Sequence, residues 1–354
     1  MDLSAFLIKL SEAHGISGYE APVREIVRQE FARHSHEVRV TKMGSLVGVR
    51  HGSGLEPHRK VMLSAHMDEI GLMVTGIEKG FLRFTQVAGS DARVMLGQEI
   101  IVHGQRELPG VVASRPPHLL TPDERSQVIP FEKQFVDVGL PEAQVKRLVR
   151  VGDLISIQRE ACELKGGFFS GKALDDRASV AAVAVCLEAL AARFAQHKWD
   201  VLGVASVQEE TTFLGAATSA YGIAPDVAIA IDVTFGDQNG VSGDQAVGMG
   251  KGPAIGIGPN FHPRLVQSLV DTAGKLEMPY QMEPTPGHSG TDAWPIQVAR
   301  EGVPTALLGI PLRYMHTPVE TVSLKDVERT GRLLAEFIAG LDQEFLKALT
   351  FPVD

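Results

Sequence analysis

The chain has 354 residues, of which 44% are hydrophobic and 22% are charged, and its net charge at pH 7 is −9. These values are ordinary for a globular protein of roughly two domains at about 150 residues each, and the negative charge argues against nucleic acid as a main partner, because phosphate binding needs clustered Lys and Arg. No apolar run approaches the roughly 18 residues of a membrane span, and the first residues show no signal-peptide pattern. The only cysteines are Cys162 and Cys186. We therefore expect a cytoplasmic protein without a membrane partner.

Two helices and then strands are predicted for the first 70 residues. Apolar residues recur at helical spacing in residues 3–10 and 23–31, which predicts two amphipathic helices. Strand-like segments follow at residues 37–50 and 60–66. The second segment is an apolar run that ends at His66, as expected for a buried strand.

Residues 72–160 differ in character and predict a small inserted β domain. The stretch is rich in β-branched residues with Gly and Pro between them, which is typical of short antiparallel strands. Within it, residues 116–130 begin and end with proline and predict an exposed loop.

From about residue 163 onward, apolar strands alternate with helices. This alternation predicts an α/β fold, a three-layer α/β/α sandwich around a mostly parallel sheet. That domain would be discontinuous, comprising residues 1–71 and 161–354, with the β domain of residues 72–160 inserted into it. Strands are predicted at residues 201–207, 227–233 and 305–310, and helices at residues 178–194, 263–276 and 324–349.

Acidic residues or histidines stand at the ends of the predicted strands or at the start of a helix. In open α/β sheets, functional sites form at the carboxyl ends of strands. His66 and Asp68 share a face at the end of one strand, so the carboxylate can orient the imidazole, as carboxylates do beside metal-binding histidines. The other residues so placed are Asp175 and Asp176, Glu209 and Glu210, Asp232, and His316.

This residue set predicts a metal centre. Two histidines and several carboxylates suit zinc, cobalt or manganese better than a structural zinc held by thiolates. Two metal ions would need one bridging carboxylate and roughly two further ligands each, and the set is large enough to supply them. A spare glutamate beside a ligating one could take a proton from water and pass it to a leaving amine, as metal-assisted hydrolysis requires.

Taken singly, each of these residues has a simpler explanation. His66 could be a hydrogen-bonded core histidine, Asp175 and Asp176 could cap a helix, and Glu209 and Glu210 could lie in a solvated loop. Their joint occurrence at strand ends favours the metal centre. The other histidines stand in polar or loop contexts, and we expect them at the surface: His14, His34, His36, His51, His58, His103, His118, His197 and His262.

Six short motifs resemble those of the glutamyl aminopeptidase family, which includes the tetrahedral (TET) aminopeptidases and proteins once labelled endoglucanases. The likeness covers essentially the whole chain. The motifs are Ala-His-Met-Asp-Glu-Ile-Gly at 65–71, Ala-Leu-Asp-Asp-Arg at 173–177, Gln-Glu-Glu at 208–210, Ile-Asp-Val-Thr at 231–234, Gly-Thr-Asp-Ala at 290–293 and Pro-Leu-Arg-Tyr-Met-His-Thr at 311–317.

The resemblance implies a pair of divalent metal ions in each subunit, zinc or cobalt before manganese. One ion would be held by His66, Asp175 and Asp232. Asp175 would bridge to a second ion, which would also be held by Glu210 and His316.

The resemblance also implies roles for the residues around the metal ions. Glu209 would be the general base and acid, and Asp68 would orient His66. Asp176 would follow a strained or cis peptide bond that aims Asp175. The residues alone leave open which of the two aspartates bridges, and the family pattern favours Asp175.

By the same resemblance, the chain would be an aminopeptidase that removes N-terminal residues from peptides, with a metal-bridging water attacking the scissile carbonyl. The inserted domain would be a small β-barrel or PDZ-like domain that helps to assemble dodecamers of dimers with their active sites facing inward. The chain departs from the family pattern at residues 286–289 and 116–135, and the first departure affects the substrate pocket. Arg313, His288 and Thr234 are candidates for contacting the substrate's first side chain.

Three other functions are considered. A related di-metal deacylase or carboxypeptidase would use the same ligands. A glycoside hydrolase is suggested by the Glu209–Glu210 pair, but adjacent residues point to opposite faces and cannot flank one sugar bond, and this reading leaves the two histidines without a role. A non-catalytic assembly protein of the same fold would not need the full set of ligands and base.

Overall fold

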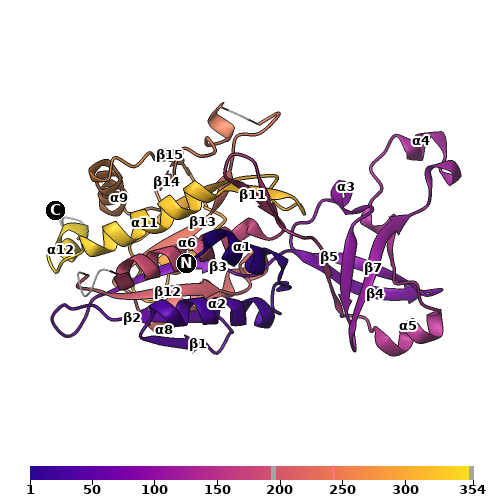
Figure 1. The fold of residues 1–354 in the computed structure, drawn as a ribbon, viewed down its shortest axis with the longest axis horizontal. Coiled ribbons are helices and arrows are strands. Elements are labelled where there is room, and N and C mark those ends of the chain that lie inside the picture. Colours follow the sequence, from indigo (N-terminus) through magenta and orange to yellow (C-terminus); the bar gives the residue numbers. More distant parts are fainter. Residues whose placement is uncertain (193–196, 242, 351–354) are drawn as a thin grey trace.

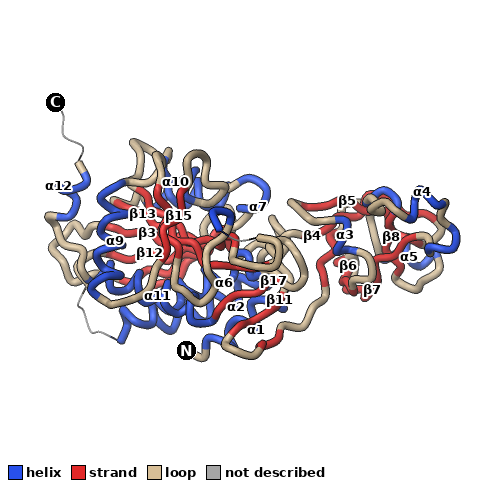
Figure 2. The backbone as a smooth tube through the Cα atoms, turned by 90° about the horizontal axis from the view of Figure 1, so that it is seen from above, coloured by secondary structure: helices blue, strands red, loops and turns tan. Residues whose placement is uncertain are grey.

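The computed structural model describes residues 1–192, 197–241 and 243–350, which form two parts of unequal size (Figure 1). The larger part carries an eleven-stranded sheet with helices on both faces, and the smaller part contains a closed six-stranded barrel. Seen from above, the barrel lies beyond one end of the sheet and extends the long axis of the molecule (Figure 2). The predicted three-layer α/β/α sandwich with a small all-β barrel inserted into it is therefore confirmed.

The centre of the sheet is parallel, and its margins are antiparallel except for the parallel pair β14–β15. Strands β12 (Asp200–Ser206), β3 (Lys60–His66), β13 (Val227–Phe235) and β16 (Thr305–Arg313) run parallel and are almost fully buried. Farther out, pairs such as β1–β2 and β10–β11 are close in sequence and pair as antiparallel hairpins, so the whole sheet is mixed. The outer strands are β1 (Glu37–Val40), β2 (Leu46–Arg50), β10 (Cys162–Leu164), β11 (Phe168–Gly171), β14 (Ala254–Ile257), β15 (Gln281–Pro284) and β17 (Glu320–Ser323).

Helices cover both faces of this sheet. Helix α6 (Leu174–Ala192) is apolar around its whole circumference because the sheet lies on one side and other helices on the rest. The last two residues of the helix predicted at 178–194 lie outside the described residues. On the face of α6 lie α1 (Leu3–Glu12), α2 (Ala21–His34), α9 (Pro263–Lys275), α11 (Leu324–Ala339) and α12 (Phe345–Leu349), and on the other face α8 (Leu214–Ile223) and α10 (Ala293–Gln297).

The barrel is antiparallel throughout and has its own apolar core. It closes in the order β4–β5–β8–β7–β6–β9, and Leu72, Leu82, Val102 and Val136 are among the side chains that fill it. The loop predicted at 116–130 is exposed and includes the short helix α4 (Pro122–Arg125). The other elements are β4 (Gly71–Glu78), β5 (Phe81–Val87), α3 (Ala92–Met95), β6 (Glu99–His103), β7 (Glu107–Ser114), β8 (Gln134–Asp137), α5 (Glu142–Leu148) and β9 (Leu154–Ile157).

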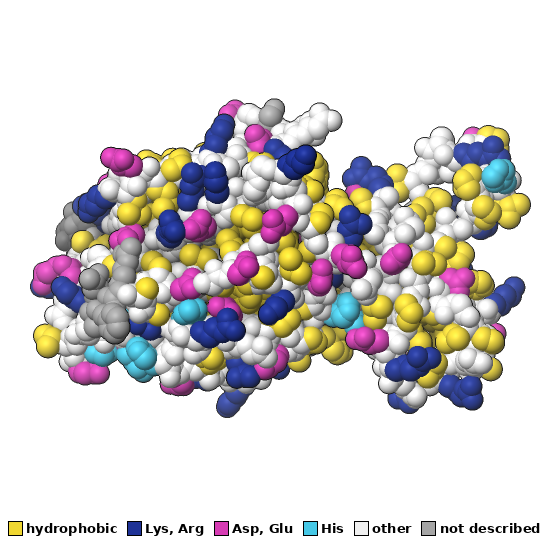
Figure 3. All heavy atoms as spheres, in the orientation of Figure 1, with side chains coloured by type: hydrophobic (Ala, Val, Ile, Leu, Met, Phe, Trp, Pro, Cys, Tyr) yellow, Lys and Arg dark blue, Asp and Glu magenta, His cyan; other side chains and the backbone are white. Residues whose placement is uncertain are grey.

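The surface mixes charges of both signs. On the face shown in Figure 3, Lys and Arg side chains are interspersed with Asp and Glu side chains over both parts of the molecule. No helix in the described ranges combines the length and the apolar character that crossing a membrane would need.

The contact between α6 and α11 provides a test of this packing. A Cβ at Gly331 of α11 would lie 2.5 Å from the carbonyl oxygen of Ala182, whereas a Cβ at Gly274 of α9 would meet nothing within 4 Å. We expect Gly331→Ala to lower the free energy of unfolding by about 1–3 kcal/mol through overpacking. Gly274→Ala is the matched control and should leave stability unchanged or raise it by up to about 1 kcal/mol. Thermal unfolding followed by circular dichroism measures both, and equal effects of the two substitutions would contradict the packing described.

Candidate metal centre

The predicted site residues converge at one edge of the sheet. Strands β3, β12, β13 and β16 are parallel, so their carboxyl ends meet at this edge. The structure brings all seven candidate residues together there: His66, Asp68, Asp175, Glu209, Glu210, Asp232 and His316.

His66 lies at the centre of the cluster and is only 1% exposed. Its Nε2 atom is 3.2 Å from Asp175 Oδ1 and 3.6 Å from Glu209 Oε2. Its Nδ1 atom is 3.4 Å from Asp68 Oδ1. The predicted pairing of His66 with Asp68 is thus present, and Nε2 faces the other carboxylates.

Asp175 lies between the two histidines. Its second oxygen, Oδ2, is 3.3 Å from His316 Nε2, which is also 3.5 Å from Glu210 Oε2. His316 Nδ1 is 3.0 Å from the carbonyl oxygen of Gly89, a residue that follows the barrel strand β5. Each oxygen of Asp175 therefore faces a different histidine.

Asp176 and Asp232 lie on the other side of His66. The peptide bond between Asp175 and Asp176 is cis. Asp176 Oδ2 accepts a hydrogen bond of 3.1 Å from the backbone N–H of His66, and its Oδ1 is buried without a hydrogen-bond partner among the residues that the structure describes. Asp176, Asp232 and His66 each offer a ligand atom within 4.8 Å of the others.

Asp68 holds the two glutamates as well as His66. Its Oδ1 accepts the backbone N–H of Glu209 at 3.0 Å, and its Oδ2 accepts that of Glu210 at 3.2 Å. These bonds position the chain where it leaves β12 and enters α7 (Glu209–Thr212). The sequence predicts that Asp68 orients His66, but not that it also anchors this turn.

The crowded carboxylates strongly perturb one another. Burial, together with the charges of Asp232 and Asp292, raises the pKa of Glu209 to about 10, and burial with the charge of Asp175 raises the pKa of Glu210 to about 8. The hydrogen bond that His316 donates to Asp175 raises the pKa of His316 to about 9, although burial opposes this change. The cluster thus holds more carboxyl groups than its two histidines can keep ionised.

These residues fit divalent metal ions. Two overlapping groups could each hold one ion, namely His66, Asp176 and Asp232, and His66, Asp175 and Glu210. All the donors are imidazole nitrogens and carboxylate oxygens, which suit zinc, cobalt or manganese. The unpartnered Asp176 Oδ1 and the excess of carboxylates are both features that bound cations would satisfy.

Two carboxylates behind the centre had no predicted role. Glu320 accepts the backbone N–H of Asp175 at 3.0 Å and that of His316 at 2.8 Å, so it spans the two segments. Asp292 accepts the hydroxyls of Ser64 at 2.7 Å and Ser206 at 2.6 Å. Asp292 belongs to the Gly-Thr-Asp-Ala motif at 290–293, whereas nothing in the sequence around Glu320 distinguishes this residue from a surface glutamate.

A buried ion cluster lies beneath the centre. Lys172 Nζ is 2.6 Å from Glu69 Oε2, and Arg177 Nη2 is 3.4 Å from Glu69 Oε1. Burial alone would raise the pKa of Glu69, but the two cations lower it below its ordinary value. Burial lowers the pKa of Lys172 to about 8, although Glu69 opposes this change. Glu69 and Arg177 belong to the motifs that carry His66 and Asp175, and Lys172 directly precedes the second of them.

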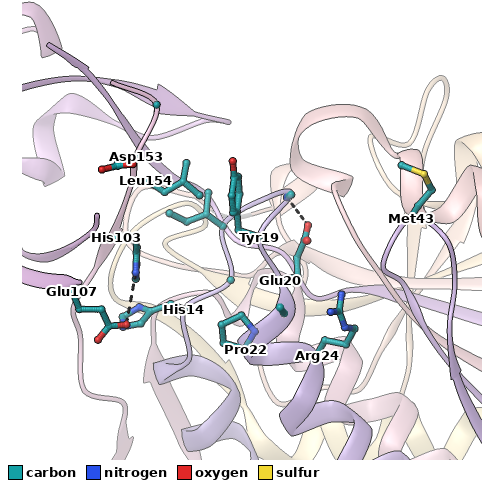
Figure 4. A pocket seen from close by; sticks show the side chains of 15 residues that line it. His14, Tyr19, Glu20, Pro22, Arg24, Met43, His103, Glu107, Asp153 and Leu154 are labelled. Carbon is teal, nitrogen blue, oxygen red and sulfur yellow. Dashed lines mark hydrogen bonds and ion pairs between the residues drawn. The ribbon is translucent and has the colours of Figure 1, made fainter. Parts of the chain in front are cut away.

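Two cavities lie near these clusters. The metal-centre residues open into one of about 540 Å³. A second, of about 610 Å³, lies between the loop of residues 14–24 and the barrel (Figure 4). In it His14 and His103 stack edge to face with ring centroids 4.9 Å apart.

Two histidines were wrongly expected at the surface, because His197 and His262 are buried. Four others are partly buried, and two of these, His14 and His103, both bond to the hydroxyl of Ser156 at 2.8 Å. Their polar neighbours in sequence do not reveal that other segments fold over them.

Comparison with known proteins gives consistent matches over nearly the whole chain. Residues 44–333 match the model of the M42 glutamyl aminopeptidase family. A lysyl aminopeptidase of Pyrococcus furiosus is 37% identical over 92% of this chain and 93% of its own length.

Solved structures agree with this match. A TET aminopeptidase from Thaumarchaeota archaeon SCGC AB-539-E09 superposes with a TM-score of 0.91 at 32% identity, covering 98% of this chain and 99% of that one. The TET1 peptidase of Pyrococcus horikoshii, which can assemble into a tetrahedron or a large octahedral shell, gives a TM-score of 0.83 at 31% identity, covering 96% of this chain and 100% of its own.

The buried ion cluster can be tested by removing its one anion. In Glu69→Gln, Lys172 and Arg177 would remain buried without a charged partner, so we expect a loss of about 3–5 kcal/mol in the free energy of unfolding. Urea unfolding in the presence of EDTA measures this loss independently of metal binding. Glu37→Gln removes an exposed carboxylate of β1 and should change stability by less than about 0.5 kcal/mol. Equal stability of the two variants would show that the cluster does not hold the fold.

Proposed function

The chain belongs to the M42 glutamyl aminopeptidase family and is a peptide hydrolase, and from this premise we propose that it removes N-terminal residues from peptides with two divalent metal ions at the His66 cluster. The observation that carries the proposal is the placement of Glu209. Its carboxylate lies 3.6 Å from His66 yet belongs to neither group of candidate metal ligands. We infer that this carboxylate moves protons beside the reacting bond and does not itself bind metal.

We propose that the ligands are divided between two ions. His66 and Asp232 would hold the first ion, Glu210 and His316 the second, and Asp175 would bridge them. The position of Asp175, with one oxygen toward each histidine, supports this division. When bound, the cations would supply Lewis acidity to the scissile carbonyl and make water acidic near neutral pH.

Glu209 is proposed as the general base and then the general acid. Its carboxylate would accept a proton from the attacking water and deliver that proton to the nitrogen of the departing peptide. Its raised pKa reflects burial among other carboxylates, and positive charge beside it would favour the ionised form that accepts the proton. Asp68 would act on this step indirectly, by holding the backbone of Glu209 and the ring of His66.

The other candidate functions are less well supported. Family membership excludes a non-catalytic protein. A glycoside hydrolase would need two carboxyl groups on either side of a sugar bond, whereas Glu209 faces His66 and Glu210 faces His316 within one cluster. A di-metal deacylase or carboxypeptidase would share the ligands and differ only in its substrate. A panel of substrates therefore distinguishes these enzymes from an aminopeptidase.

We further propose a homo-oligomer, a dodecamer built of dimers, located in the cytoplasm. The P. horikoshii TET1 peptidase forms closed shells, and its structure spans the same length of chain. The barrel projects from the catalytic part and would contribute subunit contacts (Figure 1).

The division into a catalytic domain of residues 1–71 and 161–354 and an inserted domain of residues 72–160 is part of this proposal. Cys162 and Cys186 are both unpaired, which is compatible with a reducing compartment.

A substrate panel tests the activity. We expect hydrolysis of aminoacyl-p-nitroanilides and no hydrolysis of N-acyl amino acids, which lack a free α-amine. Treatment with EDTA should abolish the activity, and added zinc, cobalt or manganese should restore it, as read from nitroaniline release. Activity only on N-acyl substrates would show a deacylase, and activity that survives EDTA would contradict a metal-dependent peptidase.

Two substitutions separate proton transfer from metal binding. Glu209→Gln should retain both metal ions and lose at least about 10²-fold in kcat, because it removes the general base. His316→Ala should lower the metal content measured by elemental analysis, because it removes a ligand. Turnover close to that of the unmodified enzyme in Glu209→Gln would refute its role, and unchanged metal stoichiometry in His316→Ala would refute the ligand assignment.

A further inference from the structure

One carboxylate of the main cavity takes no part in the candidate metal centre. Glu283, on strand β15, lines the cavity of about 540 Å³ into which His66 and Glu209 open. It belongs to neither group of candidate metal ligands. In the part of the chain that the structure describes, no Lys or Arg lines this cavity. The negative charge of Glu283 therefore remains available to a substrate after the metal ligands are accounted for.

The side-chain carboxylate of Glu283 accepts a single hydrogen bond and has no cationic partner among the described residues. The hydroxyl of Thr234 donates to its Oε1 atom, and the side chain is partly buried. Burial raises the pKa of Glu283 above its ordinary value, although the Thr234 hydrogen bond opposes the change. A partly buried carboxylate with one donor is incompletely compensated, and a cationic ligand would compensate it.

The sheet leaves room for this side chain at a glycine. Gly309 of β16 pairs with Asp232 of β13. A Cβ at Gly309 would lie 2.8 Å from Thr234 Cγ2 and 3.0 Å from Glu283 Oε2. A larger residue at Gly309 would displace the side chains of Thr234 and Glu283. The absence of a side chain at Gly309 therefore lets Glu283 reach over β16 into the cavity.

The position of Glu283 suits the end of a side chain better than the α-amine of a substrate. Asp232 and Thr234 are two residues apart on one face of β13, a separation of about 6–7 Å. The α-amine is two bonds from the scissile carbonyl carbon and must stay near the metal ligands. Glu283 accepts the hydroxyl of Thr234, and we place the end of a long first side chain at this carboxylate. Apolar groups that could contact the stem of such a side chain also line the cavity: Phe213, Val233, Pro284, Leu307 and Met315.

We propose that Glu283 determines specificity, selecting lysine or arginine as the first residue of the substrate. This inference rests on the proposed aminopeptidase function. An acidic first residue, such as the glutamate in the family's name, would place its carboxylate against Glu283 with no Lys or Arg of the described cavity lining to offset the repulsion. Of the other residues considered for this role, Thr234 and His288 line the cavity, whereas Arg313 is paired with Asp237 and does not line it.

Lysine and norleucine p-nitroanilides form a matched pair of substrates, because their side chains share the same stem and only lysine carries a charge. We expect kcat/KM to be at least about tenfold higher for lysine, because a neutral side chain leaves the carboxylate unpaired. Glu283→Gln should reduce this ratio at least about tenfold by slowing lysine cleavage, with norleucine cleavage nearly unchanged. Glu301→Gln removes an exposed carboxylate outside the cavity and should leave the ratio as it is.

A second readout requires no variant. Free L-lysine should inhibit norleucine cleavage competitively at least about tenfold more strongly than free L-norleucine does. Equal inhibition by the two amino acids, or an unchanged substrate ratio in Glu283→Gln, would overturn the proposal while leaving the aminopeptidase function intact. An equal loss on both substrates would also overturn it, because it would place Glu283 at the α-amine. A wild-type enzyme that cleaves no aminoacyl substrate would instead refute the function on which the proposal rests.

Discussion

The geometry of the site depends on one buried ion cluster, formed by Glu69, Lys172 and Arg177. Burying three charges is tolerable only if they are paired and their remaining hydrogen-bonding atoms are satisfied. Arg177 donates to the carbonyl oxygens of Met67, Leu10 and Ala13, and Glu69 accepts the backbone N–H of Gly15. The cluster thereby ties the end of α1, the exit of β3 and the entry to α6 into one rigid junction. The ligands that follow β3 and begin α6 are placed by this junction, which is also where the chain departs for the barrel.

A second constraint acts above the junction, where carboxylates hold the backbone of their neighbours. Asp68 accepts the N–H groups of Glu209 and Glu210, and Glu320 accepts those of Asp175 and His316. Each of these two acids therefore links segments that are far apart in the chain and fixes the direction in which their side chains point. Such preorganisation is what a site needs if its ligands and its proton carrier must be held at separate positions within a few ångströms. Burial, together with the charges of neighbouring carboxylates, raises the pKa values of Glu209 and Glu210, and bound cations would offset this effect.

Much of the fold was predictable because its elements have clear periodicity. The central strands are continuous apolar runs, and α6 is apolar on all sides because it is surrounded. The short strands β15 and β17 were missed, because four residues with mixed polarity do not differ from a loop until a neighbouring strand pairs with them. Strand β14 is apolar, but four residues are too few to show a period. The buried histidines were missed for a similar reason: His197 and His262 are covered by segments distant in sequence, and burial of that kind leaves no local pattern.

The sequence alone determined the chemistry that we propose for the site, since the residue types at the strand ends already predicted a nitrogen and oxygen ligand set with a spare glutamate. It also determined the family and the insertion of a β region, because motifs and composition are local properties. Only the tertiary structure decided how these residues are supported and what they face. Glu69 contacts Lys172, 103 positions away in the chain, Glu320 contacts Asp175, 145 positions away, and Glu283 contacts Thr234, 49 positions away. The physical reason is that a carboxylate's role depends on the donors and charges that folding brings to it, and these are absent from its own stretch of sequence.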